Sequence, residues 1–330
     1  MAANRKSGGR TRVEDVAGRA HVPVLLDEVL EYLQPKPGGR YLDGTLGLGG
    51  HSEEILRAAG EGAQLLGLDR DERALERAEA RLAEFGTRVT LMNVPFSRFQ
   101  GALDEMEWDT VDGALVDLGI SSFQLDEAGR GFSFALDGPL DMRMGRTGGE
   151  APASRLVNKG SVDQLKRIIW RLGEEPMAGR IARAIFDARQ MKPIETTLEL
   201  AEIVSNAYPA ARRAKARNHP ATRTFMALRM TVNQELDELE TFLAHIPDRL
   251  APGGRVAVIS FHSLEDRLVK RSFRAAAQGC TCPKDVPQCV CGKEPKLRIV
   301  TKKPVGPGDA ETAANPRARS AKLRVAERLA

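Results

Sequence analysis

The first third of the chain alternates short apolar runs with amphipathic segments. Runs rich in leucine and β-branched residues occupy positions 41–46, 64–68, 88–94 and 113–118, and each has the length of a buried strand. Between the second and third runs, "DERALERAEARLAEF" carries apolar residues at helical spacing, with charges on the opposite face: Ala74, Leu75, Ala78, Leu82 and Phe85. This alternation predicts an α/β fold with a mostly parallel sheet that is covered by helices on both faces.

The alternation stops after residue 118. Residues 121–150 are irregular and rich in glycine, residues 161–208 predict helices only, and residues 222–250 predict one long amphipathic helix. A strand returns at 253–261, beginning with the turn Pro252-Gly253-Gly254, and the tail offers two more strands, "LRIVTK" and "KLRVAE". We therefore expect one α/β domain made of residues 21–130 and 226–330, an inserted helical domain at 131–225, and a disordered basic tail at 1–20.

Composition places the chain among globular proteins. Of its 330 residues 42% are apolar and 28% are charged. No apolar run reaches the length of about 18 residues that spans a bilayer, and the N-terminus lacks the apolar core of a secretory signal. We expect a cytoplasmic protein without membrane contact. All four cysteines lie in "CTCPKDVPQCVCG", which is not the dispersed pattern of a disulfide-stapled fold and agrees with a reducing compartment.

Positive charge is concentrated in two stretches, although the net charge is only +4. No acidic residue occurs between Glu202 and Glu235, and the tail from Lys293 onward has more basic than acidic residues. Such runs are typical of surfaces that bind a polyanionic partner. Basic side chains contact the phosphates of such a partner and position it, irrespective of the partner's own sequence. The residues expected to contact this partner are Arg212, Arg213, Lys215, Arg217, Arg317 and Arg319.

A glycine-rich turn in "YLDGTLGLGGHSEEIL", residues 41–56, joins the first strand to a helix. Asp69 ends the second strand nineteen residues after Gly50, close to the spacing of about 20 at which an acid binds ribose hydroxyls. The pattern lacks G-x-G-x-x-G, and Asp43 would repel a pyrophosphate but attract a cationic ligand. S-adenosylmethionine is therefore favoured over NAD and FAD. The alternative is a plain tight turn in which Asp69 caps the next helix.

Several longer motifs resemble those of the bacterial RsmH (MraW) family: "HVPVLLDEVL", "DGTLGLGGHS", "DLGISSFQLD", "RGFSF", "PLDMRM", "ISFHSLEDR" and "NPRARSAKLRVAER". The resemblance runs from His21 to about Leu329. It implies a class I methyltransferase fold with an inserted helical substrate domain. It also implies methylation of N4 of a cytosine in the decoding region of 16S ribosomal RNA, within the small subunit or an assembly intermediate. The implied contacts to S-adenosylmethionine fall on Gly49, Gly50, His51, Asp69, Phe96, Asp117 and Gln124.

The chemistry of the transfer points to Asp117. A cytosine N4 amine is a weak nucleophile, so the enzyme must position it and accept its N–H bonds. Asp117 lies in "DLGISS", where other amino-methylating enzymes often have two prolines and an aromatic residue. The missing aromatic leaves Phe123, Phe132 and Phe134 as candidates to stack on the base, or as core residues. Ser121, Ser260 and His262 are the alternative partners of the amine, and Ser263 with Asp266 predicts a helix capping box.

The cysteines leave one question open. Cys280, Cys282, Cys289 and Cys291 form two C-x-C pairs and could supply the four thiolates of a structural zinc site, or remain thiols or redox-sensitive pairs.

Two other functions of the protein also stay open: an NAD-dependent oxidoreductase and an RNA-binding assembly factor without catalysis. The oligomeric state cannot be inferred from the sequence.

Overall fold

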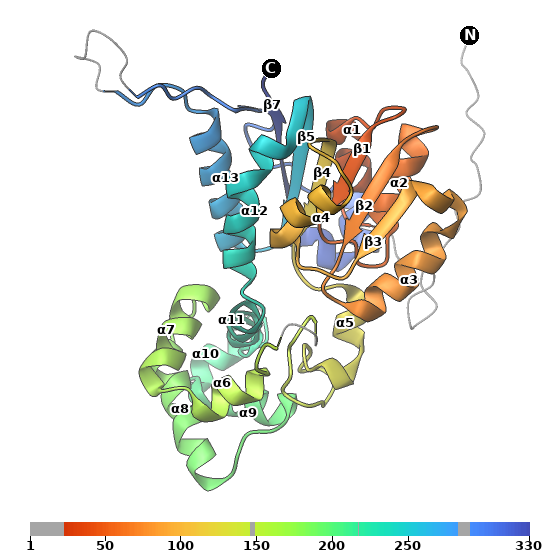
Figure 1. The fold of residues 1–330 in the computed structure, drawn as a ribbon. Coiled ribbons are helices and arrows are strands. Elements are labelled where there is room, and N and C mark those ends of the chain that lie inside the picture. Colours follow the sequence, from red (N-terminus) through yellow and green to blue (C-terminus); the bar gives the residue numbers. More distant parts are fainter. Residues whose placement is uncertain (1–22, 146–148, 217, 283–290) are drawn as a thin grey trace.

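The computed structural model describes residues 23–145, 149–216, 218–282 and 291–330. A seven-stranded sheet forms its centre, in the order β3-β2-β1-β4-β5-β7-β6 (Figure 1). Strands β1 to β5 are parallel, and β7 runs antiparallel between β5 and β6. The strands are β1 Arg40–Asp43, β2 Gln64–Leu68, β3 Val89–Met92, β4 Val111–Asp117, β5 Leu250–Ser260, β6 Leu297–Ile299 and β7 Lys322–Arg328. All seven predicted strands are confirmed, and so is the predicted α/β fold with a mostly parallel sheet.

Helices cover both faces of the sheet because its strands are apolar on both sides. One face packs against α4 Phe99–Glu105, α12 Glu235–Arg249 and α13 Ser263–Ala277, which bury Phe99, Phe242 and Phe273. The other face packs against α1 Leu26–Leu33, α2 Gly50–Ala59 and α3 Glu72–Leu82. Adjacent residues of one strand serve opposite faces: Tyr41 belongs to the second cluster and Leu42 to the first. None of the described helices combines the length and apolar character that crossing a membrane requires.

A second group of helices lies below the sheet in Figure 1 and has a hydrophobic cluster of its own. The cluster draws its buried residues from positions 132 to 232. The group consists of α6 Ala153–Lys159, α7 Val162–Gly173, α8 Ala178–Met191, α9 Thr197–Ala207, α10 Ala210–Ala214 and α11 Thr222–Val232. We call it the helical unit. The remaining short helices are α5 Ser122–Asp126, which leads into it, and α14 Asp309–Ala314 in the tail.

The prediction of one long helix over residues 222–250 is wrong. The segment forms two helices, α11 and α12, and the chain turns between them at Gln234, whose φ is 51°. Asn233 stabilises the break: its side-chain amide donates to Met142 O at 2.8 Å, and its side-chain oxygen accepts from Met144 N at 2.8 Å. Helix α11 packs in the helical unit and α12 packs on the sheet, so a straight helix could not serve both cores.

The predicted turn at Pro252-Gly253-Gly254 lies inside β5, which already begins at Leu250. The pairing with β4 is irregular there, because Val111 pairs with Leu250 whereas Gly113 pairs with Arg255. The glycines accommodate this bulge, and Gly253 has a φ of +77°.

Candidate functional site

A cavity opens at the carboxyl ends of β1, β2 and β4. Strand β1 is the switch point of the sheet, because the chain continues to β2 on one side and returns to β4 on the other. Open α/β sheets bind ligands at such a point. Six of the seven residues expected to contact the cofactor line this cavity, namely Gly50, His51, Asp69, Phe96, Asp117 and Gln124.

The glycine turn brings backbone rather than side chains to the cavity wall. Gly49 has a φ of +76° and begins α2 as its N-cap, and a Cβ there would lie 3.2 Å from Leu82 Cδ1. It therefore faces the neighbouring helix and does not line the cavity. Gly50 does line it, and a Cβ on Gly50 would lie 2.6 Å from Pro23 Cγ. Close packing thus requires glycine at both positions.

The carboxylate of Asp69 is held by the backbone around it. One oxygen accepts from Gly47 N at 2.7 Å and the other from Asp71 N at 2.8 Å. The alternative in which Asp69 caps the next helix is wrong, because Asp71 is the N-cap of α3. Burial raises the pKa of Asp69 to about 6, although the two backbone hydrogen bonds stabilise the ionised carboxylate and so lower the pKa. The two bonds fix the carboxylate while leaving lone pairs that can accept further hydrogen bonds.

Two more carboxyl groups lie at the same edge of the sheet. Asp43 is buried beneath the cavity wall, where it accepts from Ser52 Oγ at 2.6 Å and Thr45 N at 3.1 Å, and burial raises its pKa to about 6. Asp117 lines the cavity, and its pKa is raised well above the usual value by burial first and then by Asp43 and Glu265. One oxygen, Asp117 Oδ1, is buried and makes no hydrogen bond with any described residue. The site therefore concentrates negative charge that a cationic ligand would stabilise.

The neighbouring side chains mainly hold the site in shape. His51 Nε2 lies 2.9 Å from Val24 O, which ties α2 to the segment before α1. Gln124 donates to Asp71 Oδ2 at 2.8 Å, and its side-chain oxygen accepts from Ser121 N at 3.2 Å. Ser121, one alternative partner of the amine, lines the cavity as the N-cap of α5. Phe96 also lines the cavity, with its ring edge-to-face against Phe242.

The other two alternatives lie outside the cavity lining. Ser260 is buried, and its hydroxyl lies 3.4 Å from Lys322 O on β7. His262 is the N-cap of α13, and burial lowers its pKa. It forms the capping box with Glu265, so the predicted box of Ser263 with Asp266 is wrong by one position. Ser263 donates instead to Glu174 Oε2 at 2.6 Å, and Asp266 accepts from Arg324 at 2.6 Å.

None of the three phenylalanines proposed to stack on a base lines this cavity. Phe123 packs under the Arg77 guanidinium at 3.9 Å, Phe132 belongs to the cluster of the helical unit, and Phe134 stacks on His219 at 4.6 Å. Besides Phe96, Phe261 is an aromatic residue that lines the cavity, and it was not predicted from the sequence. It follows β5 directly, and its ring would lie 3.5 Å from a Cβ on Gly119, just beyond Asp117. Its position after a parallel strand is the signal that could have identified it.

The predicted RNA-contacting residues fall into two places. Arg212 and Arg213 lie on α10 and Lys215 follows directly, and all three are exposed on the helical unit. Arg317 instead lines the cavity together with Asn315 and pairs with Asp126 at 3.1 Å. Arg319 is exposed nearby. Arg217 lies outside the described residues.

Acidic residues of the returning helix complete the cavity wall and were not predicted from the sequence. Glu235 and Glu238 at the start of α12 line the cavity, together with Met144 from the segment that enters the helical unit. Arg229 pairs with Glu235 at 2.7 Å, and Arg70 lies 3.7 Å from Glu238. The cavity is thus formed by both the sheet and the connections to the helical unit.

Comparisons with known proteins relate the chain to one family by its sequence. The model of the MraW methylase family matches residues 18–329. A protein of Oleidesulfovibrio alaskensis named Ribosomal RNA small subunit methyltransferase H is 64% identical, over 94% of this chain and 95% of its own length. One of the same name from Nitratidesulfovibrio vulgaris is 62% identical, over 95% of this chain and 87% of its own. The crystal structure of an rRNA methylase from Streptococcus thermophilus aligns with a TM-score of 0.39 at 12% identity, covering 92% of this chain and 94% of that one.

Proposed function

We propose, on the premise that this chain belongs to the MraW methylase family, that it methylates the N4 amine of a cytosine in the decoding region of 16S ribosomal RNA. The protein is a methyltransferase that uses S-adenosylmethionine, so an NAD-dependent oxidoreductase is no longer a candidate. The names of its relatives support ribosomal RNA of the small subunit as the substrate. The choice of cytosine N4 rests on the motifs described above and on the chemistry of the cavity.

The cavity fits S-adenosylmethionine in charge and in shape. Asp69 would accept the ribose hydroxyls, the glycine turn would let the ligand approach the backbone, and Phe96 would pack against the adenine. Burial raises the pKa values of Asp43, Asp69 and Asp117, so a cationic ligand beside them would favour their ionised forms. When bound, the cofactor supplies an electrophilic methyl group on a cationic sulfonium, together with a cationic ammonium. The carboxylates would stabilise both charges.

One observation carries the proposal: Asp117 Oδ1 is buried at the cavity and has no hydrogen-bond partner among the described residues. A buried acceptor without a donor is costly, and an exocyclic amine can supply the N–H. An amine held in this way keeps its lone pair directed away from Asp117, and the carboxylate can take up charge that develops on the nitrogen. Phe261 provides an aromatic face at the end of the adjacent strand, where a base turned out of its stack could pack.

The helical unit and the tail would hold the RNA. Arg212, Arg213 and Lys215 present positive charge on an exposed surface of the helical unit. Arg317 places a guanidinium at the cavity itself, where it could meet the phosphate of the extruded nucleotide. Phosphate contacts at both places would position the target without reading its sequence.

The experiment is methylation of small ribosomal subunits that lack the modification, with labelled cofactor and identification of the modified nucleoside by mass spectrometry. We expect N4-methylcytidine from the decoding region. In single turnovers at saturating cofactor, Asp117→Asn should be slower by about a hundredfold or more while RNA binding is retained. Asp112→Asn is the matched control, because Asp112 lies at the opposite end of the same strand, paired with Lys36.

Two results would overturn the proposal. Methyl transfer to another atom or another base would remove the assigned substrate. A rate for Asp117→Asn within about threefold of the unmodified protein would remove the catalytic role of the charge. Binding of subunits without any transfer would leave the RNA-binding assembly factor as the better description.

A further inference from the structure

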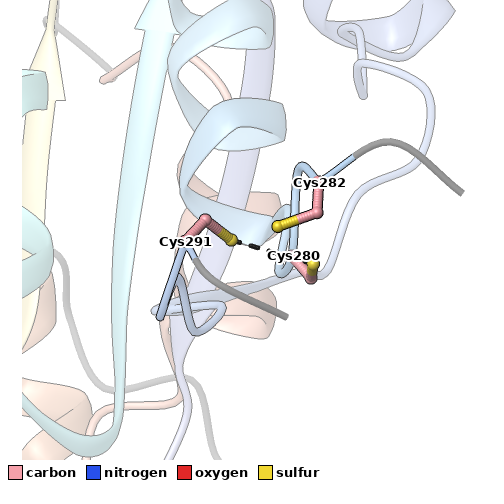
Figure 2. Close-up of side chains that lie close together, drawn as sticks. All are labelled: Cys280, Cys282 and Cys291. Atoms are coloured by element: carbon pink, nitrogen blue, oxygen red, sulfur yellow. Dashed lines mark hydrogen bonds between the residues drawn. The ribbon is translucent and has the colours of Figure 1, made fainter. Parts of the chain in front are cut away.

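Three cysteines from distant positions in the loop between α13 and β6 meet in space. Cys280 and Cys282 follow α13, and Cys291 lies on the segment that returns to β6 (Figure 2). Their sulfur atoms all lie within 4.8 Å of one another, and those of Cys280 and Cys291 are 3.7 Å apart. These residues do not line the cofactor cavity, so the cluster is separate from the site described above.

The sulfur separation is informative. A disulfide requires about 2.05 Å between sulfurs, much less than the distance from Cys280 to Cys291. Around a tetrahedral zinc ion with Zn–S bonds of about 2.3 Å, neighbouring sulfurs lie about 3.8 Å apart. The 3.7 Å between the sulfurs of Cys280 and Cys291 matches that spacing, and the sulfur of Cys282 lies within 4.8 Å of both.

The surroundings show why the loop would need such a link. Residues 291–296 are all exposed, and none of the described residues of the loop, 278–282 and 291–296, is buried. Its base is closed by two contacts, from Lys296 N to Ala276 O at 2.8 Å and from Lys296 Nζ to Asp248 at 2.6 Å. Beyond this base the ring of Pro295 lies close to Gly279, but none of the described residues of the loop belongs to a hydrophobic cluster of the protein. A crosslink through an ion would supply the stabilisation that an apolar core supplies elsewhere.

We propose that Cys280, Cys282 and Cys291 bind a single structural zinc ion that joins the two segments of this loop. Thiolates are soft ligands that favour zinc over magnesium or calcium. The two segments lead to α13 and β6, so the ion fixes the connection to the sheet edge formed by β6 and β7. Cys289, which was predicted together with these residues, lies outside the described residues.

The test begins with the full chain purified without chelators and assayed for metals by mass spectrometry. We expect about one zinc per chain and none of the visible absorption that iron–sulfur clusters or copper would give. Replacement of zinc by cobalt should produce the intense near-ultraviolet bands of cobalt–thiolate bonds. A chelator should lower the unfolding temperature of the protein, and added zinc should restore it.

The variant is Cys280→Ser with Cys282→Ser, and Thr281→Ala between them is the matched control, since Thr281 is exposed and carries no thiol. We expect the double variant to lose at least nine-tenths of the zinc and its response to the chelator, while the control keeps both. The proposal would be overturned if the protein without substitutions folded but contained no zinc. Disulfides between these cysteines under reducing conditions would also overturn it. So would a double variant that retains its zinc. Cobalt titration of the unmodified protein decides the question if the variant fails to fold.

Discussion

Cofactor affinity should fall as the pH is lowered from about 7 to about 5, because two carboxyl groups at the site have pKa values of about 6. Each is about nine-tenths ionised at pH 7 and about one-tenth ionised at pH 5. If only Asp69, which lines the cavity, must be ionised, the affinity falls about tenfold. If buried Asp43 must be ionised as well, the loss approaches about a hundredfold, since the two fractions multiply.

Calorimetry with S-adenosylmethionine across this pH range measures the effect. Asp69→Asn should bind at pH 7 about 10- to 100-fold more weakly than the unmodified protein, because the ribose loses a charged acceptor worth about 1.5 to 3 kcal/mol per bond. Its remaining pH dependence should be shallower. Asp112→Asn, at the far end of β4, should behave as the unmodified protein does. An affinity that stays within about twofold from pH 7 to pH 5 would refute the assignment of these carboxylates to cofactor binding.

The same groups predict the opposite trend for the stability of the cofactor-free protein. Folding raises their pKa from 3.8 to about 6, so ionisation is less favourable in the folded state. Their contribution to the free energy of unfolding is therefore complete below about pH 4 and is lost as the pH rises through about 6. A shift of about two units corresponds to about 3 kcal/mol per group. Denaturant unfolding of Asp43→Asn and Asp69→Asn should show a smaller loss between these pH values than the unmodified protein does.

Three further predictions concern RNA binding, the glycine turn and the helix break. Changing Arg212, Arg213 and Lys215 to Glu should leave cofactor affinity unchanged but weaken RNA association. The slope of the logarithm of RNA affinity against the logarithm of salt concentration should be shallower by about one unit per lost phosphate contact. Equal slopes for the variant and the original protein in filter binding would show that these side chains are only solvated. Gly50→Ala should lower cofactor affinity by about tenfold in calorimetry, because its Cβ would lie 2.6 Å from a proline ring. Asn233→Ala should reduce the free energy of unfolding by about 1 to 3 kcal/mol, measured with denaturant, since a buried backbone N–H at Met144 loses its acceptor; an unchanged value would contradict that role.

The parts of the fold that depend on local pattern could be predicted from the sequence. Each strand is a short apolar run, and the spacing from Gly50 to Asp69 reflects one strand–helix–strand unit, so both were accessible. The break between α11 and α12 was not, because the apolar stripe continues through it. The break is fixed by two hydrogen bonds about ninety positions away in the sequence: Asn233 donates to Met142 O and accepts from Met144 N. No local signal in the sequence carries that information.

In the candidate site, too, some residues could be predicted from local sequence and others could not. Asp69 and the glycine turn lie within one continuous segment, whereas Phe261 and Arg317 reach the cavity from the far end of the chain. The capping box of α13 was misplaced because two overlapping patterns fit the sequence, and histidine is a less usual N-cap than serine. Asp43 was expected to face the ligand, but the chain turns at Gly44 and leaves the carboxyl group beneath the wall.

Because the sheet and the connections to the helical unit line the same cavity, the two parts of the molecule are thermodynamically coupled. Met144, Glu235 and Glu238 belong to the two chain segments that connect the helical unit to the sheet, and they line the same cavity as Asp69 and Asp117. A displacement of the helical unit on binding RNA would move part of that wall and so change the free energy of cofactor binding. Such linkage is reciprocal: whatever factor RNA applies to cofactor affinity, the cofactor applies to RNA affinity. The order in which substrate and cofactor arrive would then alter the route but not the total free energy of forming the complex.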